Sequence, residues 1–269
     1  MNSSMLTAAQ KQAWESQGYF VVKGYADRAT LRDMEEGVRD LIRRVERDES
    51  IQPAFLQTED RIADPNRKLE ERASKVFRIH REIPIFHDFA CDSRLVDMLT
   101  DLLGPDIDCF LSQFIFKLPG ALGQPWHQDA FYFHFDRGPQ VGVWLAVTEA
   151  NPDNGPLSIL PASHLEPVHE AVADQREHAN LGYVEIVDHD TSAAETLLMD
   201  PGDLLIFHSH LMHRSTDNAS SQMRAAMVYH FASAQTRDLS KEKIGFVPPN
   251  IDWMPIRRSA DSSQTGSGD

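Results

Sequence analysis

The sequence predicts an α+β domain, mainly β, in which an N-terminal helical layer packs on a β-barrel. Helical periodicity is concentrated before residue 104, whereas residues 107–232 hold many short β-rich runs separated by turn signals such as NPDNGP and DPGD. A chain of 269 residues is long enough for a full core in one such domain. We therefore expect a single domain over residues 1–258, with helices mainly in 1–104 and the barrel core in 105–235.

The N-terminal part is expected to hold a strand over 19–25, closed by a glycine, between helices. Helical spacing of apolar residues and end signals such as Thr7, Ser93 and Gly104 predict three helices: 7–17, 29–48 and 93–104. Residues 46–75 are charged and poorly periodic, so we interpret them as a surface connection, with a mobile loop near a site as the alternative.

The rest of the domain is expected to be built from short strands. Runs rich in β-branched and aromatic residues predict them at 107–118, 126–135, 140–148, 157–160, 183–187, 195–199, 203–208, 212–216 and 224–232. The last residues, 259–269, are small and polar, which predicts a disordered C-terminal tail.

Composition disfavours several classes of partner. The net charge is −15, from 41 acidic and 26 basic residues, so the surface repels nucleic acids and anionic membranes. No apolar run reaches the ~18 residues that span a bilayer, and no signal peptide is recognisable at the N-terminus. The two cysteines, Cys91 and Cys109, suit a reducing compartment. We expect a cytoplasmic protein with a small-molecule substrate, and a homo-oligomer is compatible with the sequence.

A histidine and an aspartate stand two residues apart in the stretch QPWHQDAFYFHF, residues 124–135. If residues 126–135 form a strand, His127 and Asp129 project from the same face. A buried carboxylate needs a partner, and a metal ion shared with the imidazole would supply one. Alone, this spacing is a weak signal for a metal site.

A third ligand has three candidates in the block PGDLLIFHSHLMHRSTDNASSQMRAAMVYHF, residues 201–231. They are His208, His210 and His213. Two histidines and one carboxylate with open coordination positions form the facial site of non-haem Fe(II) oxygenases. Spacing alone does not choose between the three histidines.

Three blocks in order resemble the phytanoyl-CoA dioxygenase family of Fe(II)/2-oxoglutarate oxygenases. They are WHQDAFYF, GVWLAVTEANPDNGPLSILPASH and GDLLIFHSHLMHRSTDNASSQMRAAMVYHF, and the resemblance extends over roughly residues 10–235. It implies a double-stranded β-helix, a cupin-like jelly-roll barrel with helices on one side, which agrees with the pattern of elements above.

The resemblance also implies roles for individual residues. It makes His127, Asp129 and His213 the iron ligands. Arg224, eleven residues after His213, matches the arginine that binds the distal carboxylate of 2-oxoglutarate, and its planar guanidinium suits a carboxylate. Ser215 matches a position that adds a hydroxyl contact to that carboxylate.

Three further positions resemble family residues near the cosubstrate. Gln113 and Lys117 share one face of the predicted strand 107–118, where relatives place polar residues near cosubstrate or substrate. Trp144 resembles a tryptophan beside the cosubstrate, with a core aromatic as the alternative. Phe131 and Phe133 either wall the substrate pocket or belong to the barrel core.

The resemblance implies a dioxygenase that uses Fe(II), 2-oxoglutarate and O2 to hydroxylate an unactivated C–H of a small organic molecule, with release of succinate and CO2. Desaturation, epoxidation and rearrangement are alternative outcomes at the same site. A non-catalytic metal- or 2-oxoglutarate-binding protein on the same barrel is the alternative from another class. A cupin-type site on His208 and His210 ranks lower, because no glutamate follows at a suitable spacing. Substrate-contacting residues are expected in 46–82 and 165–195.

Overall fold

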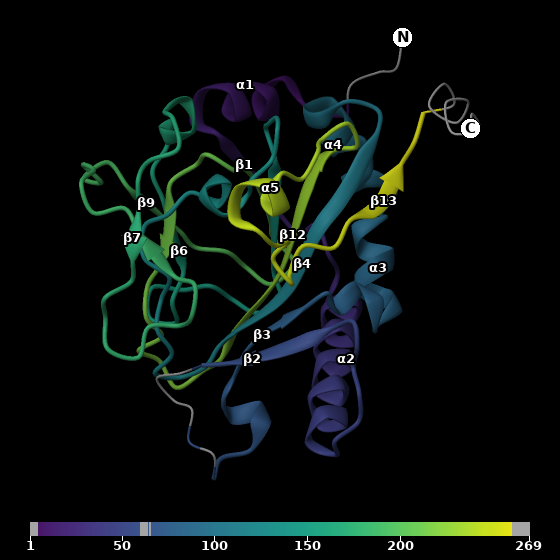
Figure 1. Cartoon of the computed structure of the whole chain (residues 1–269), viewed down its shortest axis with the longest axis vertical. Coiled ribbons are helices and arrows are strands. Elements are labelled where there is room, and N and C mark those ends of the chain that lie inside the picture. The colour runs from purple at the N-terminus through teal and green to yellow at the C-terminus, as the bar shows by residue number, and fades with distance from the viewer. Residues whose placement is uncertain (1–4, 60–63, 65, 260–269) are drawn as a thin grey trace.

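The computed structural model describes residues 5–59, 64 and 66–259. Its strands form a large sheet in the order β1-β10-β5-β12-β4-β3-β2, in which β13 also pairs with β4. A small sheet has the order β11-β6-β9, and β7 pairs with β8. All these pairings are antiparallel. The large sheet and the small sheet lie on opposite sides of the barrel (Figure 1), which confirms the predicted jelly roll.

The strands of the large sheet are β1 (Tyr19–Val22), β2 (Phe55–Thr58), β3 (Ala73–Phe77), β4 (Ile107–Lys117), β5 (Val141–Ala146), β10 (Leu204–His208), β12 (Arg224–Ser233) and β13 (Met254–Arg257). The remaining strands are β6 (Leu157–Ile159), β7 (Val172–Ala173), β8 (Val184–Glu185), β9 (Glu195–Leu197) and β11 (His213–Ser215). The helices are α1 (Ala8–Gln17), α2 (Arg28–Glu46), α3 (Pro84–Ala90), α4 (Ser93–Leu103) and α5 (Ser240–Ile244), with 3₁₀ turns η2 (Leu69–Glu71), η3 (Ile79–Arg81), η4 (Asp129–Tyr132) and η5 (Ser163–Leu165).

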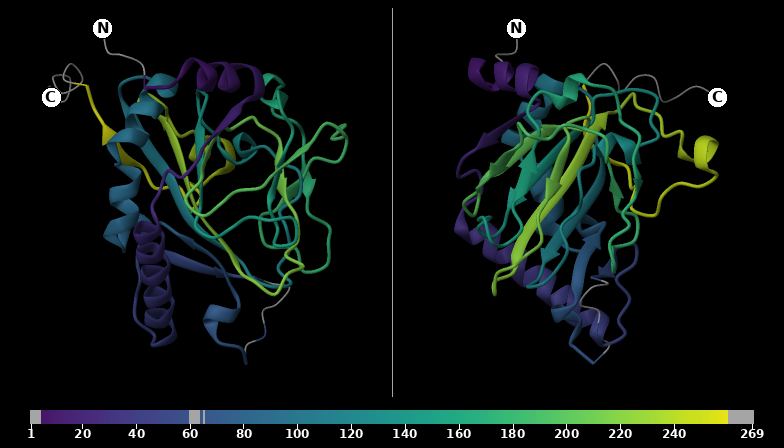
Figure 2. Two further views of the ribbon diagram at one scale, coloured as in Figure 1. Left: turned by 180° about the vertical axis from the view of Figure 1, so that it is seen from behind. Right: turned by 90° about the vertical axis from the view of Figure 1, so that its left-hand side faces the viewer.

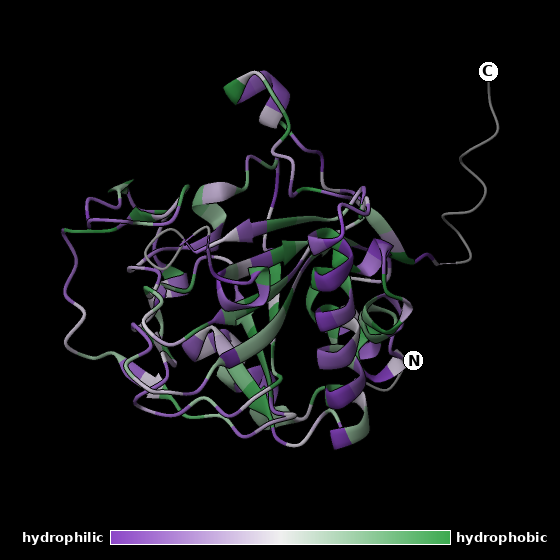
Figure 3. Ribbon diagram, turned by 90° about the horizontal axis from the view of Figure 1, so that it is seen from below, coloured by the Kyte–Doolittle hydropathy of each residue, from purple (hydrophilic) through white to green (hydrophobic). Residues whose placement is uncertain are grey.

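The helices α2, α3 and α4 cover the outer face of the large sheet, as Figure 2 shows from behind. Successive residues of a strand point to opposite faces, so β12 contributes Met227 and Tyr229 to the helical core and Ala226 and Val228 to the barrel interior. In Figure 3 hydrophobic residues gather along the central strands, and hydrophilic residues occupy the surrounding helices and loops. The sheet is therefore covered on both faces.

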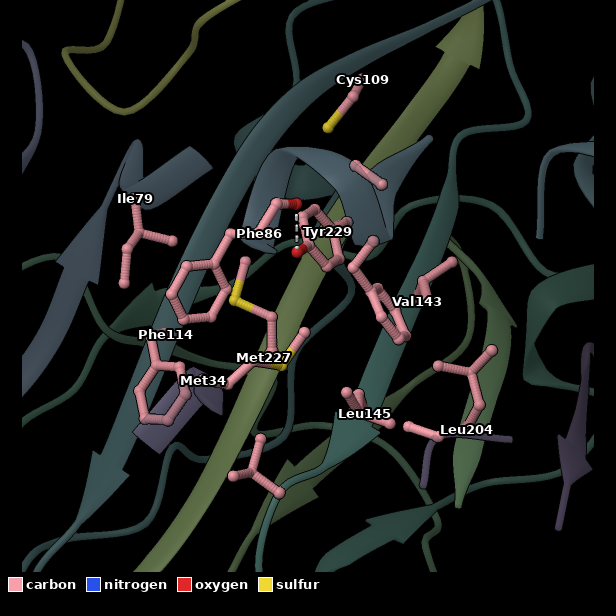
Figure 4. Packing of buried hydrophobic residues seen from close by; sticks show 14 of the residues in the cluster. Met34, Ile79, Phe86, Cys109, Phe114, Val143, Leu145, Leu204, Met227 and Tyr229 are labelled. Atoms are coloured by element: carbon pink, nitrogen blue, oxygen red, sulfur yellow. Dashed lines mark hydrogen bonds between the residues drawn. The ribbon is translucent and has the colours of Figure 1, made fainter. Parts of the chain in front are cut away.

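A buried hydrogen bond joins the helical layer to the sheet. The hydroxyl of Tyr229 donates to the carbonyl oxygen of Phe86 in α3 at 2.7 Å (Figure 4). Met34 of α2 and Phe114 of β4 pack beside this pair with Met227. A buried phenol is normally satisfied in this way, so the bond fixes α3 against the strand that also carries the site residues described below.

Local signals place the helix ends. Thr7 caps α1 in a capping box with Gln10, as the sequence predicted. The cap of α4 is Asp92, whose carboxylate accepts from the backbone N–H of Arg94 at 2.9 Å, one residue before the predicted start. The expected strand 19–25 is shorter, because the chain turns after Val22 to enter α2.

Two predictions of secondary structure were wrong. Residues 126–135 are not a continuous strand: the chain turns into η4 at Asp129. Residues 46–75 are not only a surface connection, because β2 and the buried strand β3 extend the large sheet there.

The C-terminal tail was predicted over 259–269, and residues 260–269 lie outside the described residues. Ser259 is held: its backbone N–H donates to Asp106 at 2.5 Å. The preceding residue, Arg258, contacts the carboxylate of Asp108 at 2.5 Å. The described chain is therefore anchored up to this point.

Candidate metal and cosubstrate site

His127 and His213 are paired through their backbones. The N–H of each donates to the carbonyl oxygen of the other at 3.0 Å, which makes an isolated antiparallel bridge beside β11. The ring centroids are 4.1 Å apart. Two imidazoles that are distant in the sequence are thus presented together by neighbouring extended segments.

The Nδ1 atom of each ring is hydrogen-bonded to a backbone carbonyl oxygen. Nδ1 of His127 lies 2.7 Å from the carbonyl oxygen of Pro125, and Nδ1 of His213 lies 2.9 Å from that of Leu211. A carbonyl only accepts, so each Nδ1 donates and each neutral ring keeps a lone pair on Nε2. The Nε2 atoms of His127 and His213 lie 3.5 and 3.8 Å from Oδ1 of Asp129.

The two oxygen atoms of the Asp129 carboxylate face different partners. Its Oδ2 atom lies 2.7 Å from Nε2 of His230 in β12, which leaves Oδ1 facing the two imidazoles. Burial would raise the pKa of Asp129, but the neighbouring His213, His230 and His127 together hold it well below its ordinary value. An ionised, oriented carboxylate is the form that binds a metal.

The residues of this cluster fit a divalent iron. Within the described residues, the ligand atoms of His127, Asp129 and His213 lie within 4.8 Å of one another. Burial, and then His127, lowers the pKa of His213 to about 4, so its ring is neutral near neutral pH. Two imidazoles with fixed tautomers and one ionised carboxylate are the donor set of non-haem Fe(II) sites.

A second, cationic end of the site lies between β4, β11 and β12. The ammonium group of Lys117 donates to Oγ of Ser215 and to the carbonyl oxygen of Thr216, both at 2.7 Å. Lys117 pairs with Arg224 across the sheet. Burial and the charge of Arg224 lower the pKa of Lys117 well below its ordinary value.

Arg224 is buried against neutral partners. Its Nη2 donates to the carbonyl oxygen of Gly155 at 2.7 Å, and its guanidinium lies 5.4 Å from the ring centroid of Trp144. Its Nε has no partner among the described residues. Burial lowers the pKa of Arg224 to about 10, so the group stays charged near neutral pH. A buried cation with no carboxylate partner favours an anionic ligand.

One cavity contains every residue that the sequence singled out for the site. It is lined by Lys75, Gln113, Ile115, Lys117, Gln124, His127, Asp129, Trp144, Leu157, Tyr183, Phe207, His213, Ser215, Arg224, Val228 and His230. The side chains of His127, Asp129 and His213 and the cationic end therefore share one cavity.

Sequence reasoning missed several residues of this cavity, among them His230, Lys75 and Tyr183. His230 is separated from Asp129 by 101 positions, and no local spacing signals their contact. Lys75 lies on β3, where no strand was expected, with its ammonium 4.7 Å from the ring centroid of Tyr183. Both Lys75 and Tyr183 fall in the two ranges, 46–82 and 165–195, where pocket residues were expected.

The other candidate ligands lie elsewhere. His208 packs against the rings of Trp14 and His164, and its Nδ1 accepts from the backbone N–H of His210 at 3.0 Å. Burial lowers the pKa of His208 to about 3. Of the three histidines left open by spacing, only His213 joins the cluster of described metal-binding side chains.

Two aromatic residues near His127 and Asp129, namely Phe133 and Trp126, pack in hydrophobic clusters. Phe133 packs against Phe110 and Phe135 in a cluster of its own, with ring centroids 4.8 and 5.6 Å away. Trp126 packs with Leu160 and neighbours in another cluster. The core alternative therefore holds for Phe133.

Comparison with known proteins identifies the family. The sequence model of the family described as phytanoyl-CoA dioxygenase (PhyH) matches residues 14–226. The chain belongs to the phytanoyl-CoA dioxygenase family. This PhyH-family chain is 26% identical over 254 residues to the 2-aminoethylphosphonate dioxygenase of an uncultured bacterium, covering 93% of this chain and 92% of the relative. It is 24% identical over 258 residues to the ectoine dioxygenase of Sphingopyxis alaskensis, covering 86% and 78%.

Solved structures share the fold. EctD from S. alaskensis, in its apoform, superposes with a TM-score of 0.70 at 20% identity, over 93% of this chain and 85% of that one. The epimerase SnoN, in complex with Fe3+, alpha ketoglutarate and nogalamycin RO, gives 0.65 at 15% identity, over 86% and 84%. The PhyH-family chain is an Fe(II)/2-oxoglutarate-dependent dioxygenase acting on a small molecule. No described helix is long and apolar enough to cross a membrane.

Proposed function

We propose that His127, Asp129 and His213 hold Fe(II), that the cationic end of the cavity holds 2-oxoglutarate, and that the bound substrate is hydroxylated between them. One observation supports this arrangement above all others: a single cavity is lined by the buried two-histidine, one-carboxylate cluster and by the guanidinium of Arg224, which has no carboxylate partner among the described residues. When bound, Fe(II) with 2-oxoglutarate and O2 supplies the oxidising power, and succinate and CO2 are released.

The chain's own groups orient the cosubstrate. Arg224 offers a planar fork to the distal carboxylate, and Ser215 offers a hydroxyl beside it. Lys117 already donates to that hydroxyl, so Ser215 can turn its own proton toward the carboxylate. Trp144 lies under the guanidinium and limits its movement. These contacts fix one end of the dicarboxylate, and the other end then faces His127 and His213.

The remaining cavity wall suits a compact substrate. Leu157, Phe207 and Val228 are buried and line the cavity, so they exclude water from the reacting carbon. Gln113 and Lys75 add polar groups to the same wall. Relatives named for ectoine, methylphosphonate and 2-aminoethylphosphonate support a small polar molecule as the substrate. The net charge of −15 argues against a nucleic acid.

The direct test is succinate formation from 2-oxoglutarate with Fe(II), ascorbate and O2. A panel of small zwitterions and phosphonates is screened for stimulated succinate release, and mass spectrometry detects the added oxygen atom in the product. His213→Ala is expected to abolish turnover. Arg224→Ala is expected to raise the 2-oxoglutarate requirement roughly 10- to 150-fold, since a hydrogen bond to a charged group contributes about 1.5–3 kcal/mol.

His210→Ala is the matched control, because His210 is a nearby histidine outside the cluster. It should keep turnover. The assignment is overturned if the wild-type chain binds neither metal nor 2-oxoglutarate, or if His213→Ala is active while His210→Ala is not. Bound iron without any decay of 2-oxoglutarate would indicate a non-catalytic binding protein instead.

A further inference from the structure

A second group of metal-binding side chains lies outside the cavity. Glu166 and His169 follow η5, and His189 follows β8. Oε2 of Glu166 lies 2.8 Å from Nε2 of His169 and 2.7 Å from Nε2 of His189. The three ligand atoms lie within 4.8 Å of one another. We call this group the Glu166 cluster.

The tautomer of His189 leaves an electrostatic conflict in the Glu166 cluster. Nδ1 of His189 lies 3.0 Å from the carbonyl oxygen of Asp190, so this nitrogen donates its proton. Nε2 of a neutral ring is then an acceptor, and it faces the carboxylate oxygen of Glu166, which is also an acceptor. Two acceptors in contact repel unless a positive charge lies between them.

A divalent transition-metal ion would satisfy this demand with all three side chains. Two imidazole nitrogens and a carboxylate oxygen are the ligands that Zn2+ takes in proteins, with a fourth position left for water. The side chains of His189, His169 and Glu166 are 17%, 26% and 41% exposed, so an ion reaches them from solvent. The carbonyl of Asp190 fixes the ring of His189 in the way that a partner behind a ligand does.

We propose that the Glu166 cluster is a second, structural metal site that binds Zn2+ or a similar divalent transition-metal ion. Its ligands stand on both sides of the hairpin formed by β7 and β8, with Glu166 and His169 before it and His189 after it. An ion held by all three ties the two ends of this hairpin together. The hairpin strands are only two residues long, so little else in the hairpin's own ladder holds it closed.

A metal ion bound by the Glu166 cluster would affect the cavity through two contacts. Tyr183, directly before β8, lines the cavity and covers the ammonium of Lys75. The backbone N–H of His169 donates to Oε1 of Gln128 at 2.7 Å, and Gln128 stands between His127 and Asp129. Closing the hairpin therefore fixes one wall of the cavity beside the first two ligands.

The test measures zinc stoichiometry in a chain whose active-site cluster has lost a ligand. His213→Ala protein is dialysed against Zn2+, and bound zinc is measured by elemental mass spectrometry. It is expected to keep one equivalent. Adding His189→Ala or Glu166→Gln is expected to remove that equivalent. His178→Ala is the matched control, because His178 lies in the same hairpin and its side chain is 58% exposed. It should keep the zinc.

A second readout follows the hairpin itself. Zn2+ should slow proteolysis between residues 174 and 183 in His213→Ala protein, and this protection should disappear with His189→Ala. Circular dichroism verifies that each variant is folded. The proposal is overturned if folded His213→Ala protein binds no zinc, or if the added His189→Ala and Glu166→Gln changes leave the equivalent in place. Neither readout uses oxygenase turnover, so the outcome is independent of the proposed function.

Discussion

Nε2 of His230 lies 2.7 Å from Oδ2 of Asp129, and both groups are buried. This contact engages one carboxylate oxygen and leaves the other facing His127 and His213, where the metal is proposed to bind. It also joins β12 to the 3₁₀ turn η4, two parts of the chain that no local pattern connects. A ligand that starts a turn, rather than a strand, needs such a contact to hold its orientation.

We expect the loss of this contact to weaken iron binding. His230→Leu removes the donor to Asp129 and should lower the affinity for Fe(II) or Co2+ by about 10- to 100-fold, the usual effect of losing a partner behind a ligand. His230→Gln keeps an N–H donor and should recover part of the affinity. Equilibrium dialysis with Co2+ measures both. Equal affinities for His230→Leu and wild type would show that Asp129 is oriented by other groups.

The buried Lys117 is expected to reduce the stability of the ligand-free protein. Its pKa is lowered in the folded chain, so between the folded and the ordinary pKa the unfolded chain binds more protons, and stability rises with pH through that window. Lys117→Met should therefore be more stable than wild type near neutral pH, and the difference should shrink above the ordinary lysine range. Urea denaturation at several pH values measures this. A less stable Lys117→Met protein would contradict it.

Binding of 2-oxoglutarate should be coupled to proton uptake. A dianion near Lys117 raises the lowered pKa of this group, so binding takes up a proton at pH values between the pKa of the free and of the bound protein. The affinity should fall as pH rises from the free to the bound pKa. Calorimetry in buffers with different ionisation enthalpies detects the proton. Lys117→Met is the control: the same uptake in this variant would assign the proton to another group.

Gly155→Ala should damage the cationic end of the cavity. A Cβ at Gly155 would lie 2.2 Å from Cδ of Lys117 and 2.7 Å from the carbonyl oxygen of Thr216, and the residue has φ +82°. Crowding and backbone strain should destabilise the protein by about 1–3 kcal/mol each. The 2-oxoglutarate affinity should fall as well, because Gly155 also accepts from Arg224. Gly182→Ala is the control for strain alone, since nothing lies within 4 Å of its Cβ position and its φ is +85°.

Tyr229→Phe should affect stability without affecting the site. The change leaves the carbonyl of Phe86 buried without its donor and should lower the free energy of unfolding by about 1–3 kcal/mol. The side chain points to the helical face of β12, away from the cavity. Chemical denaturation gives the loss, and the KM for 2-oxoglutarate should stay at the wild-type value. A raised KM would mean that the helical layer controls the cavity.

The sequence predicted the strands of the barrel well because their faces alternate between two apolar environments. β4, β10 and β12 coincide with predicted runs within one or two residues. The 3₁₀ turn at Asp129 could not be predicted, since a histidine and an aspartate two positions apart share a face in a strand and also converge here through a turn. The side chains of His127 and Asp129 thus lie together, as expected, but through a turn rather than the expected strand.

The residues that sequence reasoning missed are placed by contacts between distant parts of the chain. The segment around β3 is rich in charged residues, among them Lys68 just before η2 and Lys75 on β3 itself. Hydropathy alone therefore does not reveal that five successive residues of β3 are buried. Burial there comes from β2 and β4 on the two edges of β3 and from the helical core on one face. The position of His230 depends on the register of β12 against β4 and β5, which no single segment encodes.

The hairpin of β7 and β8 is exposed, with Leu181 86% and Val172 47% accessible, yet Tyr183 reaches the cavity. The groups proposed to bind metal and dicarboxylate come instead from the barrel strands and the bridge beside them. Changes in the hairpin can therefore alter the cavity wall at Tyr183 while the barrel residues of the site stay in place. Exchanging this segment between homologues is therefore a direct way to change which molecules the barrel binds.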